Sequence, residues 1–181
     1  MRFAILPPLL LGRLIPPVIA VAALSALAAS AMAGDGGVSI GGGGGTGTGD
    51  EGHLFPLPAK HSYGDGYGAG RGHEGQDIFA RCGKPLIAAR AGRIKYRGRD
   101  GGAGNYVVIN GRGTRRDYMY AHLKRRASVR VGERVAVGDV IGKVGQTGNA
   151  SGCHLHFELW RGDWNGRPDV TRKLRQWDKY S

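Results

Sequence analysis

The chain has 181 residues, of which 26 are Lys or Arg and 14 are Asp or Glu, giving a formal net charge of +12. This length is compatible with one domain plus appendages, and the 34 glycines are clustered, as in linkers and tight turns rather than helices. The basic excess favours attraction to an acidic polymer such as nucleic acid, anionic lipid or an anionic cell wall.

The first segment, residues 1–33, has the pattern of a signal peptide. Arg2 and Arg13 flank its early stretch, an apolar run covers 18–29, and Ala-Met-Ala at 31–33 offers small residues for cleavage. We expect cleavage here, which places the rest of the chain outside the cytoplasm as a secreted, periplasmic or wall-associated protein.

An uncleaved membrane anchor is the alternative for this leader. Residues 14–33 cover the roughly 20 positions that a membrane-spanning helix needs. Pro16, Pro17 and the alanine-rich composition weaken such a span. Contact with a membrane is therefore expected only if the leader is retained.

A glycine-rich stretch, "GDGGVSIGGGGGTGTGDEG", fills residues 34–52. It has almost no side chains to bury and is expected to be a flexible linker. A phosphate-binding loop would end in Gly-Lys-Ser/Thr, which is absent here. The folded domain is therefore expected to cover residues 53–181.

Short apolar or alternating runs, each closed by Gly, Asn or Asp, dominate this domain. They are "PLIAAR", "GRIKYRG", "NYVVIN", "RDYMYAHL", "VGERVAVGDVIGKVG" and "HLHFELW". A single short helix is expected near 170–177, where apolar residues fall at helical spacing. The pattern predicts a mainly β domain of small antiparallel sheets.

The last run contains two histidines one residue apart. On a strand, His154, His156 and Glu158 share one face, while the apolar residues between them face the core. Two neutral imidazoles side by side suit a metal ion. Two ordinary polar-face histidines are the alternative for an isolated pair.

Two more motifs carry histidines. "GRGHEGQDIFA" contains His73 and Asp77 among glycines, and "YMYAHLK" contains His122, expected on the same strand face as Tyr118 and Tyr120. With one histidine of the pair, the first motif supplies two imidazoles and a carboxylate. Catalytic zinc sites use three such ligands and keep a fourth position open.

The order H-x-G-x-D, A-H-L and H-L-H-F-E resembles the lysostaphin/LytM-type zinc endopeptidases of bacterial cell walls. The likeness runs from about residue 61 to 169. It implies a compact antiparallel β fold with an open groove. It also implies that one zinc ion is bound by three residues, His73, Asp77 and His156.

The same resemblance implies that His122 and His154 lie beside the reacting water, as general base and transition-state stabiliser. The expected activity is hydrolysis of cross-links or stem peptides in peptidoglycan. A catalytically silent wall-binding or hydrolase-activator domain on the same fold is the alternative.

The chain has two cysteines, Cys82 and Cys153. The metal site implied by the resemblance would bring their segments together, and in an exported protein a disulfide is the expected result. A catalytic Cys153 is the rival interpretation, although strand alternation turns it away from His154 and His156.

The remaining basic clusters are expected to be solvated surface, with attraction to anionic wall polymers as the more specific hypothesis. No binding motif or array of stacking aromatics indicates a nucleic-acid partner. His53 and His61, in the entry segment, are expected at the surface.

Overall fold

A computed structural model describes residues 52–70, 72–162 and 166–181 of the chain. The predicted leader, 1–33, lies outside these ranges, as does the predicted linker, 34–52, apart from its last residue. Both therefore remain predictions. No helix within the described ranges is long and apolar enough to cross a membrane.

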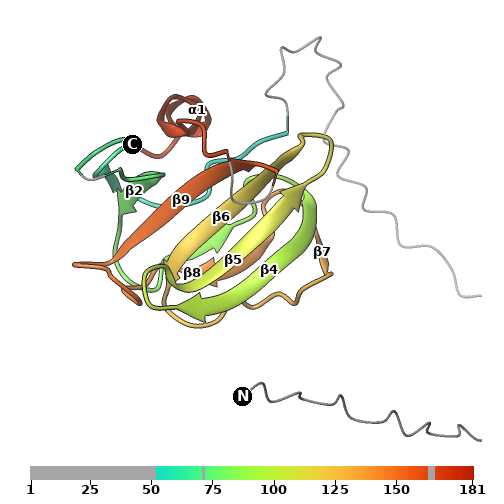
Figure 1. Cartoon of the computed structure of the whole chain (residues 1–181), viewed down its shortest axis with the longest axis horizontal. Helices are drawn as coiled ribbons and strands as arrows, with labels where there is room; N and C mark the ends of the chain where they lie inside the picture. The colour runs from blue at the N-terminus through green and yellow to red at the C-terminus, as the bar shows by residue number, and fades with distance from the viewer. Residues whose placement is uncertain (1–51, 71, 163–165) are drawn as a thin grey trace, which may run out of the picture. The chain divides into compact units, whose positions relative to one another are not determined.

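The described residues form two antiparallel sheets and one short helix (Figure 1). The larger sheet has the strand order β1-β2-β9-β6-β5-β4-β7, and β3 pairs with β8 in a two-stranded sheet. The elements are β1 Ser62–Tyr63, β2 Gln76–Phe79, β3 Pro85–Ile87, β4 Gly92–Asp100, β5 Gly104–Gly111, β6 Arg116–Leu123, β7 Arg134–Val135, β8 Val140–Lys143, β9 His154–Arg161 and α1 Thr171–Trp177. The predicted mainly β, antiparallel fold is confirmed.

Alternation along the central strands separates the core from the opposite face of the sheet. Leu155, Phe157 and Leu159 of β9 are buried in the main core, which also contains residues of β3, β8 and α1. The other face of β9 carries the two histidines and Glu158, as predicted. One face of β9 therefore packs in the core, while its two histidines and Glu158 lie on the opposite face.

The end of β6 breaks this alternation. Tyr118, Tyr120 and Leu123 all belong to the core, so two residues, Ala121 and His122, oppose one residue of β5. His122 has a φ of 58°, which a non-glycine residue rarely adopts. Such a bulge re-aims a side chain. The expectation that His122 shares a face with Tyr118 and Tyr120 was wrong, because the bulge turns it away from the core.

The end of α1 and the residue after it contact the segment that enters the domain, residues 53–61. His53 stacks on Trp177 with ring centroids 4.6 Å apart, and the fully buried side chain of His61 (0% exposed) lies 3.0 Å from a carboxylate oxygen of Asp178. The expected surface position of His61 was therefore wrong, because an acid just beyond α1 covers its imidazole.

Candidate metal centre and active site

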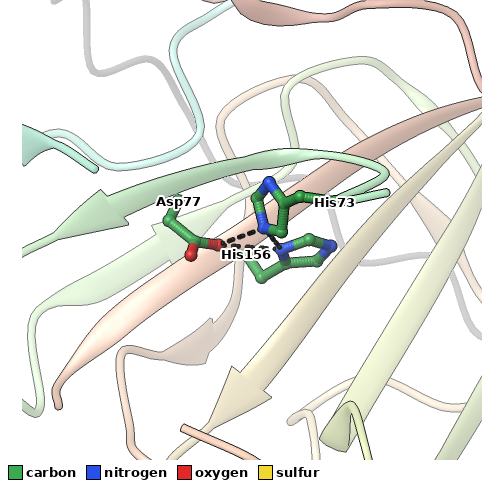
Figure 2. A group of neighbouring side chains, drawn as sticks. All are labelled: His73, Asp77 and His156. Carbon is green, nitrogen blue, oxygen red and sulfur yellow. Dashed lines mark hydrogen bonds and ion pairs between the residues drawn. The ribbon is translucent and has the colours of Figure 1, made fainter. Parts of the chain in front are cut away.

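Three side chains from two distant parts of the chain converge on one point (Figure 2). Nε2 of His73 lies 3.1 Å from Oδ1 of Asp77 and 3.1 Å from Nδ1 of His156. Nδ1 of His156 lies 2.8 Å from the same carboxylate oxygen. His73 lies in the loop before β2, Asp77 in β2 and His156 in β9. The three meet because Asp77 and His156 are paired across the two strands.

A glycine permits this convergence. A Cβ atom at Gly75 would lie 2.6 Å from the backbone oxygen of Phe157 and 2.8 Å from the ring of His156. Both distances are shorter than a normal contact, so any side chain there would push the loop away from β9. Gly75 therefore lets His73 and Asp77 reach His156.

The outer nitrogen of each of these imidazoles is already engaged. Nδ1–H of His73 donates to the backbone oxygen of Gly66 at 2.9 Å, and Nε2–H of His156 donates to Oε1 of Glu158 at 2.9 Å. Histidines that bind metals typically donate their second N–H in this way. Each of His73, Asp77 and His156 offers one ligand atom, and these atoms lie within 4.8 Å of one another. This donor set fits a divalent cation such as zinc.

The contacts between Asp77, His156 and Glu158 change the pKa values of Asp77 and His156. Burial alone would raise the pKa of Asp77, but the hydrogen bond and positive charge of His156 outweigh it and lower that pKa. Burial lowers the pKa of His156, but hydrogen bonds to Asp77 and Glu158 outweigh it and raise that pKa to about 9. The protein's own charges therefore keep a proton on His156 near neutral pH, in the place that a cation would take.

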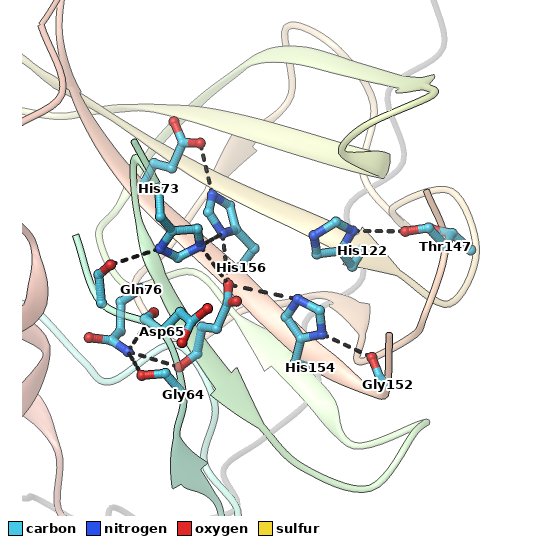
Figure 3. Close-up of polar contacts among 12 residues, drawn as sticks. Gly64, Asp65, His73, Gln76, His122, Thr147, Gly152, His154 and His156 are labelled. Atoms are coloured by element: carbon cyan, nitrogen blue, oxygen red, sulfur yellow. Dashed lines mark hydrogen bonds and ion pairs between the residues drawn. The ribbon is translucent and has the colours of Figure 1, made fainter. Parts of the chain in front are cut away.

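His122 and His154 lie beside the cluster (Figure 3). Their ring centroids are 4.6 Å apart, and that of His122 is 5.9 Å from that of His156. Nδ1–H of His122 donates to the backbone oxygen of Thr147 at 2.8 Å, and Nδ1–H of His154 donates to that of Gly152 at 2.9 Å. Because a carbonyl only accepts, these bonds select the tautomer in which Nε2 is unprotonated.

Burial lowers the pKa of His122, and the neighbouring histidines add to this effect, while the Thr147 hydrogen bond and Asp77 only partly oppose it. His122 is therefore neutral at neutral pH and able to accept a proton at Nε2.

All five predicted site residues line one open groove of about 420 Å³. They are His73, Asp77, His122, His154 and His156. The groove lies on the face of β9 and β6 opposite the main core, where Glu158 and Met119 also line it. The structure thus brings together every residue that the resemblance selected, and their roles remain proposals.

The motifs did not reveal the residues that hold this cluster in place. Gln76 is buried (1% exposed), and its Nε2 donates to the backbone oxygens of Gly64 and Asp65. This fixes the loop whose Gly66 oxygen accepts from His73. Glu158 was expected on the face of His156, but its contact with that ring was not predicted. The motif H-L-H-F-E contains a signal for it, because residues two apart on a strand are neighbours.

The two cysteines form a disulfide. Cys82 and Cys153 are bonded, with their Cα atoms 5.2 Å apart. The predicted pair is confirmed, and the rival interpretation of Cys153 as a nucleophile is wrong because its thiol is consumed. The bond ties the segment after β2 to the residue before His154.

The chain is similar in sequence to several known endopeptidases. Over 91 residues the chain is 41% identical to the peptidoglycan DD-endopeptidase ShyC of Vibrio cholerae, covering 49% of this chain and 20% of that protein. It is 35% identical over 149 residues to the L-Ala--D-Glu endopeptidase of Bacillus subtilis, covering 71% of this chain and 44% of that protein. The chain thus spans less than half the length of these two relatives.

A solved structure is also similar. The catalytic domain of the antimicrobial peptidase lysostaphin from Staphylococcus simulans superposes with a TM-score of 0.60 at 30% identity, covering 64% of this chain and 92% of that domain. The model of Peptidase family M23 matches residues 71–168, which is more than half of the chain and contains all five groove residues named above. The chain therefore belongs to peptidase family M23.

Proposed function

We propose that the chain is an exported zinc-dependent endopeptidase that hydrolyses peptide bonds of bacterial peptidoglycan. One observation carries the proposal: the donor atoms of His73, Asp77 and His156 converge in an open groove beside two further imidazoles. One relative is named a peptidoglycan DD-endopeptidase and another an L-Ala--D-Glu endopeptidase, which supports the substrate class.

His73, Asp77 and His156 would hold the zinc ion. When bound, zinc polarises a carbonyl oxygen and lowers the pKa of water from about 16 towards 7. Gly66 and Glu158 keep the two imidazoles oriented for this task through their N–H groups.

The proton-transfer steps fall to the other two histidines. His122 is neutral with Nε2 free, so it can accept a proton from the attacking water and return it to the leaving amine. His154 also lines the groove, with its Nε2 3.7 Å from Oδ1 of Asp77, and its imidazolium form would stabilise negative charge that develops on the substrate.

The test is release of new amino groups from purified peptidoglycan by the zinc-loaded chain, with and without a chelator. We expect release that the chelator abolishes and that added zinc restores. Identification of the freed residues would name the bond. Absence of release by a folded, zinc-loaded chain would refute the proposal and favour the silent wall-binding or activator domain.

A further inference from the structure

A second cavity, of about 460 Å³, lies between β8 and the segment that follows β6. Its lining is dominated by cationic side chains, and it contains no Asp, Glu or aromatic residue. The lining residues are Lys124, Arg125, Arg126, Ser128, Val140, Gly142 and Lys143. We call this site the cationic cavity.

Its four cations are exposed, and the acid next to the lining, Asp139, accepts a hydrogen bond from the backbone N–H of Ala136. Among the residues that the structure describes, Lys124, Arg125, Arg126 and Lys143 form no ion pair. The sequence contains no Asp or Glu in 118–132 or in 140–157. Four like charges that repel one another around one hollow favour an anion that would relieve this repulsion.

The backbone links this cavity to the groove. Lys124 lies two residues after His122, and its backbone N–H donates to the oxygen of Lys143 at 2.9 Å. Beyond Lys143, Gly145 pairs with His154. The segment that carries His122 and the segment that pairs with His154 therefore both continue into the cationic cavity.

Further cations border the cavity. The disulfide holds Cys82 beside the His154 strand, and a Cβ atom at Gly83 would lie 3.9 Å from Nζ of Lys124. Arg81 and Lys84, both exposed, flank this contact. The positive surface thus extends past the cavity, which suits a chain of anionic groups better than a single ion.

We propose that the cationic cavity binds phosphate groups of an anionic polymer. Arginine guanidinium groups match phosphate oxygens in pairs, and lysine adds point charge. The lining has no aromatic side chain on which the bases of a single-stranded nucleic acid could stack. Val140 is its one exposed large apolar side chain, too little for insertion into a lipid surface. If the proposed peptidase function holds, such binding would keep the groove beside its substrate.

The test measures binding of fluorescein-labelled inorganic polyphosphate to the full chain by anisotropy, at physiological salt. A chelator is present throughout, because polyphosphate itself binds divalent cations. The test variant replaces the four cations of the cavity with Gln: K124Q, R125Q, R126Q and K143Q. The matched control removes four exposed charges elsewhere: R99Q, R112Q, R134Q and R172Q.

We expect the test variant to bind about 10- to 100-fold more weakly, since each cation near an anionic surface contributes a few-fold. The control should change affinity by about threefold or less, because distant charges are screened at this salt concentration. Equal weakening in both variants would overturn the proposal, since net charge alone would then explain binding.

Two further measurements keep the test decisive. Tighter binding of the parent chain to anionic phospholipid vesicles or to duplex DNA than to polyphosphate would overturn the assignment in favour of those partners. Thermal unfolding checks the fold of both variants. If the quadruple test variant fails to fold, the comparison is repeated with two double variants, R125Q/R126Q as the test and R99Q/R172Q as the control. None of these measurements involves peptidoglycan or zinc, so their outcome is independent of the peptidase proposal.

Discussion

Glu158 accepts a hydrogen bond from Nε2 of His156 at 2.9 Å, which leaves Nδ1 of that ring facing Asp77. The carboxylate is itself held, because its Oε2 accepts from Nε1 of Trp160 at 2.5 Å and lies 3.2 Å from Nε of Arg167. Arg167 also pairs with Glu74, the neighbour of His73. Glu158 is thus a positioning residue for the proposed metal ligand.

Replacing this carboxylate should loosen the metal site. We expect Glu158→Ala to weaken zinc binding by about 10- to 100-fold, the usual cost of losing such a partner. Glu158→Gln, which keeps an acceptor oxygen, should have a smaller effect. Competition with a chromogenic chelator measures the affinity. Glu133→Ala, at an exposed acid outside the groove, is the control, and an unchanged affinity for Glu158→Ala would contradict the role.

Substitutions of His156 and His122 should have different effects on metal binding and on catalysis. His156→Ala should lose zinc, whereas His122→Ala should keep it and lose activity by about 10²- to 10⁴-fold, the usual contribution of a general base. Metal analysis of both purified variants, together with the amino-group assay, checks this. Full zinc content in His156→Ala would remove that residue from the ligand set.

Zinc affinity should depend on pH through His156. Its pKa of about 9 in the absence of metal means that the ring carries a proton at neutral pH, which must leave before Nδ1 can bind a cation. The apparent affinity should therefore rise by about tenfold per pH unit between roughly pH 7 and 9 and level off above. Calorimetry in buffers of different ionisation enthalpy would count the released proton. Zinc binding without proton release at pH 7.5 would contradict this pKa.

Removing the disulfide should destabilise the domain. The bond closes a loop with a sequence separation of 71, so the chain-entropy model predicts a loss of up to about 4 kcal/mol in the Cys82→Ser/Cys153→Ser variant. Urea unfolding of this variant and the parent gives the difference. A thiol assay on unfolded, unreduced parent protein should find no reactive thiol, and two reactive thiols would show that the bond does not form.

The position of His122 shows the limit of reading strands from sequence. Alternation predicts that it shares a face with Tyr118 and Tyr120. In the structure Leu123 is also in the core, so β6 has one extra residue in a bulge between Tyr120 and Leu123. A bulge depends on the register against β5, which no pattern within β6 specifies. The same holds for the Thr147 carbonyl that selects the His122 tautomer, since 25 residues separate them.

By itself, the sequence determined the mainly β class and the face of β9 that carries His154 and His156, and its motifs, together with the family resemblance, selected the five groove residues. Alternation and short motifs are local, so these features could be read along the chain. Only the tertiary structure revealed the bulge at His122, the hydrogen bond between Glu158 and His156, and the cavity lined by Lys124 and Lys143. Each of these joins segments that are distant in sequence or depends on strand register, and such contacts are set by packing of the whole domain.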